Sequence, residues 1–336
     1  MTAYFRPLPQ TGLSRPADAL PIAGGWTWFT HVALISRAGP GRIMPVADVP
    51  QEVLQAISAP RPALLSLDMT RPALMGILNV TPDSFSDGGQ FTTTKNAVQH
   101  GLAMQGDGAD MIDIGGESTR PGADFVPATV EIERTEPVIA KLANTGGLPI
   151  SIDTRKSKVA AAAIKAGATM INDVSALRFD DGLIDIAVEN QVPVCLMHAQ
   201  GDPKTMQQDP VYKSVLLDVY DDLSARVSLA VAAGLPRHLI VVDPGIGFGK
   251  TVQHNLTLLQ NLSLFHGLGC PILLGASRKR FIGNIGNAQN ASERMPGSIA
   301  VTLAGLAQGV QIHRIHDVKE TRQAISLWMA VTGAER

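Results

Sequence analysis

The sequence predicts a closed (β/α)8 barrel (TIM barrel) at residues 71–336, preceded by an N-terminal extension at residues 1–70. From residue 73 onward, short apolar runs rich in β-branched residues alternate with longer amphipathic runs. Eight such short runs, each followed by a helix candidate, fit within about 260 residues. Polar side chains recur where the apolar runs end. A doubly wound open sheet is the alternative, but it more often contains fewer units and one fingerprint turn.

The expected strands lie at residues 73–80, 111–116, 149–154, 169–174, 193–198, 239–245, 271–277 and 312–317. Helix candidates between them include "KSKVAAAAIKAG" and "VYKSVLLDVYDDLSARVSLAVAAG". Several of these end in a glycine (Gly167, Gly234 and Gly309), the residue that commonly stops a helix. The extension differs, because it is rich in proline and holds two of the three tryptophans, Trp26 and Trp28. Its stretch "GWTWFTHVALISRAG" predicts a pair of strands, and it suggests no function.

Composition indicates a globular protein with a large core. The chain has 336 residues, of which 45% are hydrophobic and 17% charged, and its net charge is −2. No basic run of the kind that binds nucleic acid is present, so an acidic ligand must be held by a few well-placed cations. No apolar run reaches the ~18 residues of a membrane helix, and the first residues lack the form of a signal peptide. We therefore expect a cytoplasmic protein in which Cys195 and Cys270 are buried and reduced.

The stretch "VVDPGIGFGKT" at residues 241–251 is similar to two nucleotide-binding motifs and fits neither. The phosphate-binding loop needs a glycine where this chain has Pro244. The dinucleotide fingerprint needs a third glycine where it has Lys250. What remains is Asp243 at a strand end, followed by a turn rich in glycine.

The carboxyl ends of barrel strands meet at one mouth, where barrel enzymes carry their chemistry. The polar residues at or just after the expected strand ends are Asn79, Glu117, Ser118, Thr119, Arg120, Asp153, Asn172, Asp173, His198, Asp243, Ser277, Arg278, Lys279, Arg314, His316 and Asp317. Exit of the chain to solvent explains some of them. It explains less well a carboxylate or carboxamide directly after apolar residues, since burying such a group without a partner costs about 1–3 kcal/mol. A ligand rich in N–H groups would supply the partners.

Several motifs together resemble the dihydropteroate synthase family: "MGILNVTPDSFSDGG", "DIGGESTRPGA", "SIDTRK", "MIND", "CLMHAQGDPKTMQ", "DPGIGFGK", "GASRKRFIG" and "RIHDVKET". The resemblance runs from about residue 73 to the C-terminus and leaves the first 70 residues outside. It implies an enzyme that joins a dihydropterin, carried as its hydroxymethyl pyrophosphate, to p-aminobenzoate in folate biosynthesis. Dihydropteroate forms and pyrophosphate leaves.

The resemblance also implies a set of site residues. Those expected to bind the pterin are Asp153, Asn172, Met197, Asp243, Gly275 and Lys279. Those expected at the pyrophosphate are Asn79, Arg120, Arg314 and His316, with Mg²⁺ bridging the phosphate oxygens near Asn79. Those expected at the p-aminobenzoate are Phe85, Thr119, Pro121, Phe248 and Arg280. We expect Asp153, Lys279 and Arg120 to be the catalytic residues, with Asp153 stabilising a pterin cation after pyrophosphate departs.

Two features modify this expectation. Many family members read Ser-Arg-Lys-Ser after the seventh strand, whereas this chain reads "SRKR", with Arg280 in place of a hydroxyl near the aminobenzoate carboxylate. The loops "NVTPDSFSDGG" and "ESTRPGA" have few apolar anchors, so we expect them to move and to close over the substrates. We also expect inhibition by sulfonamides and, from the family, a homodimer.

The sequence is also compatible with two other functions and with one possible metal pair. A methyltetrahydrofolate-binding methyltransferase barrel shares pterin-reading positions but does not need Arg120, Arg314 or Lys279. A pterin-binding module without catalysis would bind ligand and release no pyrophosphate. The pair His313 and His316 could pass for zinc ligands, but a spacing of three in a strand places them on opposite faces.

Overall fold

The computed structural model describes residues 3–81, 90–118, 123–201 and 205–334. Its centre is a parallel barrel made of strands β6 (Ala73–Asn79), β7 (Met111–Gly115), β8 (Ile150–Asp153), β9 (Met170–Asp173), β10 (Val194–Met197), β11 (Ile240–Asp243), β12 (Leu273–Leu274) and β13 (Ile312–Ile315). Their hydrogen-bonded order is β11-β10-β9-β8-β7-β6-β13-β12. A parallel bridge between Val242 and Ile272 joins β11 to β12 and closes the ring. The barrel prediction is confirmed, and every strand lies inside its predicted range.

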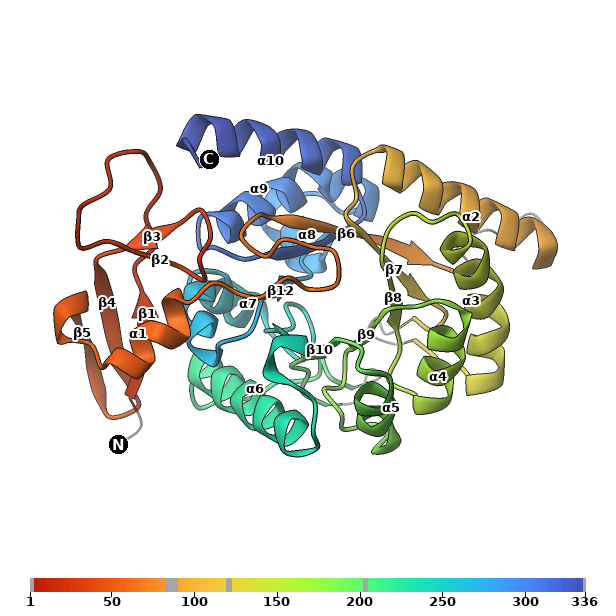
Figure 1. Ribbon diagram of the computed structural model, residues 1–336, viewed down its shortest axis with the longest axis horizontal. Helices are drawn as coiled ribbons and strands as arrows, with labels where there is room; N and C mark the ends of the chain where they lie inside the picture. The colour runs from red at the N-terminus through yellow and green to blue at the C-terminus, as the bar shows by residue number, and fades with distance from the viewer. Residues whose placement is uncertain (1–2, 82–89, 119–122, 202–204, 335–336) are drawn as a thin grey trace.

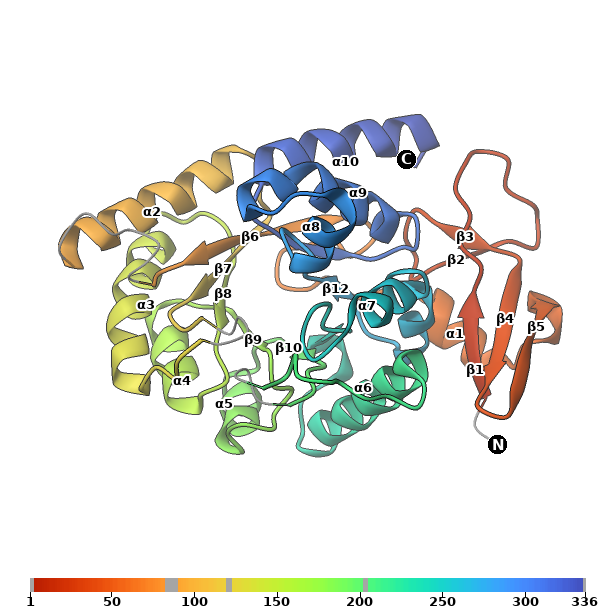
Figure 2. The same cartoon turned by 180° about the vertical axis from the view of Figure 1, so that it is seen from behind.

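Helices surround this barrel on its outer face (Figures 1 and 2). They are α2 (Gln90–Gly106), α3 (Ala128–Ala143), α4 (Ser157–Ala166), α5 (Gly182–Asn190), α6 (Val215–Ala232), α7 (Val252–Leu259), α8 (Arg280–Gly286), α9 (Met295–Leu306) and α10 (Val318–Thr332). Gly167 ends α4 with φ of 115°, a left-handed conformation that glycine adopts without steric cost. The predicted helix stop at this residue is confirmed.

Side-chain alternation along the strands divides the buried residues into two groups. One alternate set faces the surrounding helices and joins the main core, as Leu74 and Leu78 of β6 do. The other set fills the barrel interior with Ala73, Met75, Met111, Met170, Cys195, Val241, Leu273 and Ile312. Leu64 and Met69 pack into the same interior cluster. Residues N-terminal to the predicted boundary at 70 therefore contribute to the barrel core.

The N-terminal extension has strands, a helix and a core of its own. Its elements are β1 (Ala3–Pro7), β2 (Leu20–Pro21), β3 (Trp28–Phe29), β4 (His31–Ser36), β5 (Gly39–Pro45) and α1 (Gln51–Ser58). The prediction that residues 25–39 form a strand pair was wrong in its pairing, because β3 pairs with β2, and β4 lies between β1 and β5. Partners distant in sequence supply these contacts. Phe29, Val32 and Ile57 are fully buried between the extension's sheet and α1.

The extension lies beside α6 (Figure 2), and polar contacts attach it there and to residues 262–268, which follow α7. Arg37 donates 2.7 Å hydrogen bonds to Asp218 and Asp221 of α6. The buried guanidinium of Arg61 donates to the carbonyl oxygen of His266 at 2.9 Å. The extension is therefore docked on the barrel by specific side chains, and it covers one flank.

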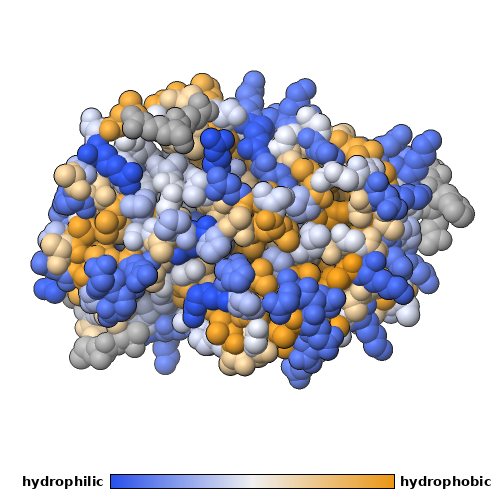
Figure 3. All heavy atoms as spheres, viewed as in Figure 1, coloured by the Kyte–Doolittle hydropathy of each residue, from blue (hydrophilic) through white to orange (hydrophobic). Residues whose placement is uncertain are grey.

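Two further expectations concern the cysteines and the helices. Cys195 and Cys270 are both free and buried, as predicted. Among the helices that the structure describes, none is long and apolar enough to span a membrane. On the face seen in Figure 3, hydrophobic residues are interspersed with hydrophilic ones.

Candidate active site

The alternation that fills the barrel interior also positions the polar residues above it. Two residues after an interior position, the next side chain of the same strand faces inward again, one layer nearer the carboxyl end. Met111 is thus followed by Asp113, Met170 by Asn172, Val241 by Asp243 and Ile312 by Arg314. The register agrees, because Gly115 pairs with Asp153 and Asp153 pairs with Asn172 across neighbouring strands. Polar side chains from distant parts of the chain therefore form one layer at the mouth.

Arg314 lies at the centre of this layer. Its Nε donates to Asp113 Oδ2 at 2.6 Å, and its Nη2 donates to Asp153 Oδ2 at 2.7 Å. Asn172 Nδ2 donates to the same Asp113 oxygen at 3.0 Å. The second oxygens of both carboxylates, Asp113 Oδ1 and Asp153 Oδ1, are buried and have no hydrogen-bond partner among the described residues. Buried acceptors of this kind call for a donor, and a bound ligand can supply it.

Asp113 is a site residue that sequence reasoning missed. It is fully buried in the middle of β7, and the search for polar residues concentrated on the ends of strands. The available signal was a lone carboxylate between two isoleucines in the apolar run "MIDIGG".

Burial and neighbouring charges shift the pKa values of the titratable groups in the site. Burial raises the pKa of Asp153 to about 7, and the positive charge of Arg314 opposes this effect. Burial also raises the pKa of Asp243, opposed by Lys279. For Lys279, burial lowers the pKa to about 8, with Asp243 acting in the other direction. Lys279 therefore lies within electrostatic range of both Asp243 and Asp153.

The glycine-rich loop after β11 makes the sharp turn that its sequence indicates. Asp243 Oδ1 accepts a hydrogen bond from the backbone N–H of Gly245 at 2.7 Å. Gly245 has φ of 68°, and a Cβ there would lie 1.8 Å from the carbonyl oxygen of His198. Only glycine allows the two loops to approach so closely. The loop thus fixes Asp243 in place beside β10.

Lys250, at the end of that loop, is a second residue that the predictions did not include. Its ammonium group lies 2.9 Å from His198 Nδ1 and donates to the carbonyl oxygens of Phe248 and His198 at 3.0 and 3.3 Å. Burial lowers the pKa of Lys250 to about 7 and that of His198 to about 2, so the imidazole is neutral and accepts. Lys250 joins the loops after β10 and β11 beneath the site.

Lys279 and Phe248 are in contact beside Asp243. The Lys279 ammonium lies 4.4 Å from the centre of the Phe248 ring and donates to the carbonyl oxygen of Ile246. Gly275 lies between Asp243 and Arg314, because a Cβ at this position would make ordinary van der Waals contact with Asp243 Oδ2 at 3.5 Å and with Arg314 Cδ at 3.9 Å. Met197 is buried at the end of β10, opposite Asp243 in the register. Arg280 follows Lys279 at the start of α8 and is exposed.

Asn79 and His316 complete the set of predicted residues that the structure describes. A Cβ on Gly115 would lie 3.8 Å from Asn79 Oδ1 and 3.7 Å from Asp153 Oδ2, so these two side chains flank Gly115. His316 lies just beyond β13, with Nδ1 3.0 Å from Ser277 Oγ. His313 instead faces the helices, with Nε2 3.1 Å from the carbonyl oxygen of Val310. The two histidines diverge, as expected.

Four predicted residues lie outside the described residues: Phe85, Thr119, Arg120 and Pro121. The same is true of most of the two loops that are expected to move.

Some polar residues after the strands have structural partners instead. Asp173 accepts hydrogen bonds from the backbone of Ser175 and Leu177 and shapes its own turn. Glu117 is buried against Lys156, with a nitrogen–oxygen distance of 3.0 Å. A polar residue at a strand end is therefore only a candidate for the site. Its hydrogen bonds and ion pairs show whether it faces the mouth or stabilises a nearby turn or helix.

Comparison with known proteins agrees with this geometry. A sequence model of the pterin binding enzyme family matches residues 75–316. The dihydropteroate synthase of Neisseria meningitidis serogroup B is 46% identical over 263 residues, covering 76% of this chain and 92% of the relative. That of Escherichia coli K12 is 44% identical over 261 residues, covering 78% and 92%.

Solved structures give the same result. The Xanthomonas albilineans dihydropteroate synthase with 4-aminobenzoic acid has a TM-score of 0.75 and 46% identity, covering 79% of this chain and 94% of that one. The Yersinia pestis enzyme in complex with a sulfonamide drug has a TM-score of 0.75 and 43% identity, covering 80% and 96%. The chain belongs to the pterin-binding enzymes and, within them, to the dihydropteroate synthase family.

Proposed function

We propose that this chain joins 6-hydroxymethyl-7,8-dihydropterin pyrophosphate to p-aminobenzoate, giving 7,8-dihydropteroate and pyrophosphate, in folate biosynthesis. Family membership supports the reaction, and one relative from Xanthomonas albilineans has been solved with 7,8-dihydropteroate. The observation that carries the proposal lies in this chain. Two buried carboxylate oxygens, Asp113 Oδ1 and Asp153 Oδ1, lack partners among the described residues, inside a mouth also lined by Asn172, Asp243 and Lys279. Such a set suits the N–H-rich edge of a pterin.

Each group has a distinct task in holding the pterin. Asp243 accepts from ring N–H and amino groups, and the carboxamide of Asn172 exchanges hydrogen bonds with the same edge. Lys279 donates to the pterin carbonyl or a ring nitrogen. The flat ring is proposed to lie over Gly275, whose missing side chain adds no atoms between Asp243 and Arg314.

The reaction follows from where the charges lie. The carbon–oxygen bond to pyrophosphate breaks with both electrons leaving on the anion, and the remaining carbon is a cation delocalised into the pterin. The Asp153 carboxylate stabilises that cation. The amine of p-aminobenzoate then forms the new carbon–nitrogen bond and releases a proton. No covalent intermediate with the enzyme is required.

The leaving group needs cationic partners. Within the described residues, the Nη1 amino group of Arg314 has no hydrogen-bond partner, so it is available to a phosphate oxygen while Nε and Nη2 hold the carboxylates. Arg120 and His316 are the further proposed partners.

Magnesium fits this end of the site as an ion carried by the substrate. The described residues contain no group of three or more His, Cys, Asp or Glu side chains that could hold a metal on their own. Asn79 offers one carboxamide oxygen beside Asp153, and Mg²⁺ is commonly held by one or two protein ligands plus phosphate oxygens. When bound there, it would neutralise charge on the pyrophosphate.

The p-aminobenzoate is proposed to lie against Phe248, with its carboxylate toward Arg280. The complex of the Yersinia pestis relative with a sulfonamide drug supports inhibition of this enzyme by sulfonamides, competitive with p-aminobenzoate. We also propose a homodimer, on the family resemblance, and a cytoplasmic location, where the two free cysteines would stay reduced.

A coupled assay for pyrophosphate tests the function. We expect pyrophosphate release from the pterin substrate to depend on p-aminobenzoate and to match dihydropteroate formed, mole for mole. Binding of the pterin without pyrophosphate release would favour a non-catalytic pterin-binding module. Transfer of a methyl group from methyltetrahydrofolate would favour the methyltransferase alternative.

A further inference from the structure

A cavity of about 660 Å³ opens between the N-terminal extension and the C-terminal half of α10, away from the active site. Its lining includes Pro72, immediately before β6, and Gly333 and Ala334, which follow α10. These residues lie at the amino ends of the barrel strands, whereas Asp153 and Arg314 lie at the carboxyl ends. The volume is within the range of small-molecule sites, roughly 300–1,000 Å³.

The charge of this cavity is of one sign. Its lining includes Arg15, Arg71 and Arg322 and no aspartate or glutamate, in a protein whose net charge is −2. Arg322 is already paired with Asp110 and the carbonyl oxygen of Gly108. The side chains of Arg15 and Arg71 make no hydrogen bond or ion pair of 4.0 Å or less within the described residues, although Arg71 lies close enough to Asp68 to contribute to the lowered pKa of that carboxyl, and both arginines are exposed to solvent. Two guanidinium groups are therefore available to an anion.

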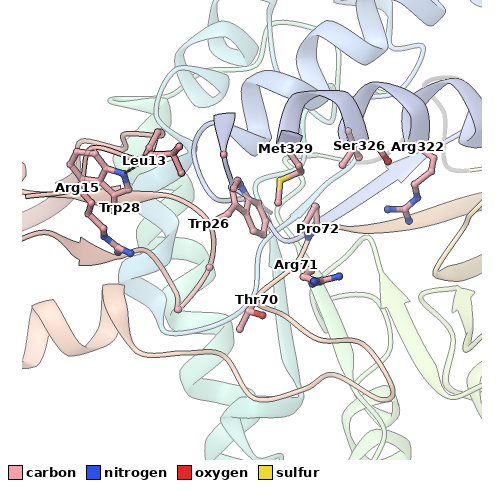
Figure 4. Close-up of a pocket in the computed structure, with 16 residues that line it drawn as sticks. Leu13, Arg15, Trp26, Trp28, Thr70, Arg71, Pro72, Arg322, Ser326 and Met329 are labelled. Carbon is pink, nitrogen blue, oxygen red and sulfur yellow. Dashed lines mark hydrogen bonds between the residues drawn. The ribbon is translucent and has the colours of Figure 1, made fainter. Parts of the chain in front are cut away.

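The centre of the cavity is apolar and aromatic. In Figure 4, Trp26, Pro72 and Met329 converge near its middle, with Arg71 beside them and Arg15 next to Trp28. Both indole N–H groups are already used, since Trp26 donates to the carbonyl oxygen of Leu306 at 2.9 Å and Trp28 to that of Gly12 at 3.3 Å. The half-buried ring of Trp26 can therefore offer an apolar face to a ligand without leaving a buried donor unpaired, whereas the ring of Trp28 is buried.

We propose that this cavity binds a small molecule that combines a flat apolar ring with an anionic phosphate or carboxylate group. The ring packs against Trp26 and Met329, and the anion pairs with Arg71 or Arg15. The residues that the extension contributes, including both tryptophans, precede the part of the chain that matches the family, which starts at residue 75. The site is thus distinct from the synthase site.

The tryptophans allow a direct test. The chain has three, so a Trp328→Phe background leaves only Trp26 and Trp28, both in the cavity lining, as emitters. Phenyl phosphate is the probe, inorganic phosphate supplies the charge alone, and benzyl alcohol supplies the ring alone. Benzoate replaces phosphate by carboxylate. Far-UV circular dichroism and unchanged synthase kcat confirm that each variant is folded.

We expect phenyl phosphate to change tryptophan emission with a saturable curve. Arg71→Glu or Arg15→Glu should weaken this binding by at least about tenfold, because the pairing cation becomes an anion. Arg42→Glu, an exposed substitution on β5 outside the cavity, should leave it unchanged. A linear, non-saturating response would overturn the proposal. So would binding of phenyl phosphate as tight as that of the Trp328→Phe background in both the Arg71→Glu and the Arg15→Glu variant. Equal binding of inorganic phosphate would overturn the role of the ring.

Discussion

Arg314 Nη2 donates a 2.7 Å hydrogen bond to one oxygen of Asp153, Oδ2, and leaves the other oxygen, Oδ1, buried without a partner among the described residues. Arg314 belongs to β13 and Asp153 to β8, and the two residues are 161 positions apart in the sequence. One side of the carboxylate is therefore fixed by a cation, and the other faces the place where the substrate is proposed to bind. This arrangement orients a negative charge before any ligand arrives, which is the condition for electrostatic stabilisation of a developing cation.

The pKa of Lys279 predicts a pH dependence. Burial lowers this pKa to about 8, and the ammonium must keep its protons to support the bound pterin. The contribution of Lys279 should therefore be present below about pH 8 and lost as pH rises through that value, whereas Asp153, whose pKa is raised to about 7, loses its negative charge as pH falls through 7. Lys279→Arg keeps a charged donor and should move the falling limb of log(kcat/KM) for the pterin substrate to higher pH. The exposed Lys319→Arg is the control, and an identical limb in all three proteins would contradict this role.

Gly275→Ala should weaken pterin binding without weakening the fold. The added methyl would meet Asp243 Oδ2 at 3.5 Å and Arg314 Cδ at 3.9 Å, ordinary van der Waals contacts, yet it would occupy space proposed for the ring. We expect KM for the pterin substrate to rise by roughly tenfold, about 1.4 kcal/mol. Gly286→Ala, where a Cβ meets nothing within 4 Å, is the matched control. An unchanged KM of Gly275→Ala for the pterin substrate would show that the pterin ring does not lie beside Gly275.

Lys250→Met tests the link between the two loops. Removing the side-chain nitrogen leaves the carbonyl oxygens of His198 and Phe248 without this donor, so the free energy of unfolding should fall by about 1–3 kcal/mol above about pH 9, where the nitrogen is a neutral amine that still donates. The pKa of Lys250 is lowered from 10.5 to about 7, so the stability it contributes is present above pH 10.5 and lost as pH falls toward 7. The difference between wild type and variant in urea unfolding should narrow from about pH 9 to about pH 7. Lys319→Met should show no such trend; if both variants behave alike, Lys250 has no special role.

Arg280→Ala examines the departure from the family motif. Arg280 is exposed at the start of α8, next to Lys279. If it holds the carboxylate of p-aminobenzoate, the variant should raise KM for that substrate by roughly tenfold and leave KM for the pterin unchanged. Arg42→Ala on the extension serves as the control. Unchanged kinetics would assign the carboxylate to backbone N–H groups instead.

Much of the barrel could be predicted because its strands are buried on both faces. Such strands read as continuous apolar runs, and their ends are marked by polar residues such as Asp153 and Asn172. Those same ends identified Asp243, Lys279 and Arg314, which the structure brings to one mouth. The family motifs added the chemistry that the pattern alone leaves open.

Other features depend on contacts that no local pattern contains. Asp113 is buried in mid-strand, and its importance appears only when Arg314 and Asn172 are seen to share its Oδ2. The partnership of Lys250 with His198 joins loops 52 residues apart. In the extension, β4 pairs with β1 and β5 rather than with its neighbour β3, because long-range packing decides the partners of short strands.

The most direct test of the central claim separates catalysis from binding in Asp153→Asn. The neutral amide cannot stabilise the pterin cation, so we predict that kcat falls roughly 100-fold or more. The Kd of the pterin pyrophosphate, measured by isothermal titration without p-aminobenzoate, should change by less than about threefold. Asn172→Ala, in contrast, should raise that Kd. Equal losses of kcat and affinity in Asp153→Asn would show that Asp153 only binds the pterin, and would contradict the account.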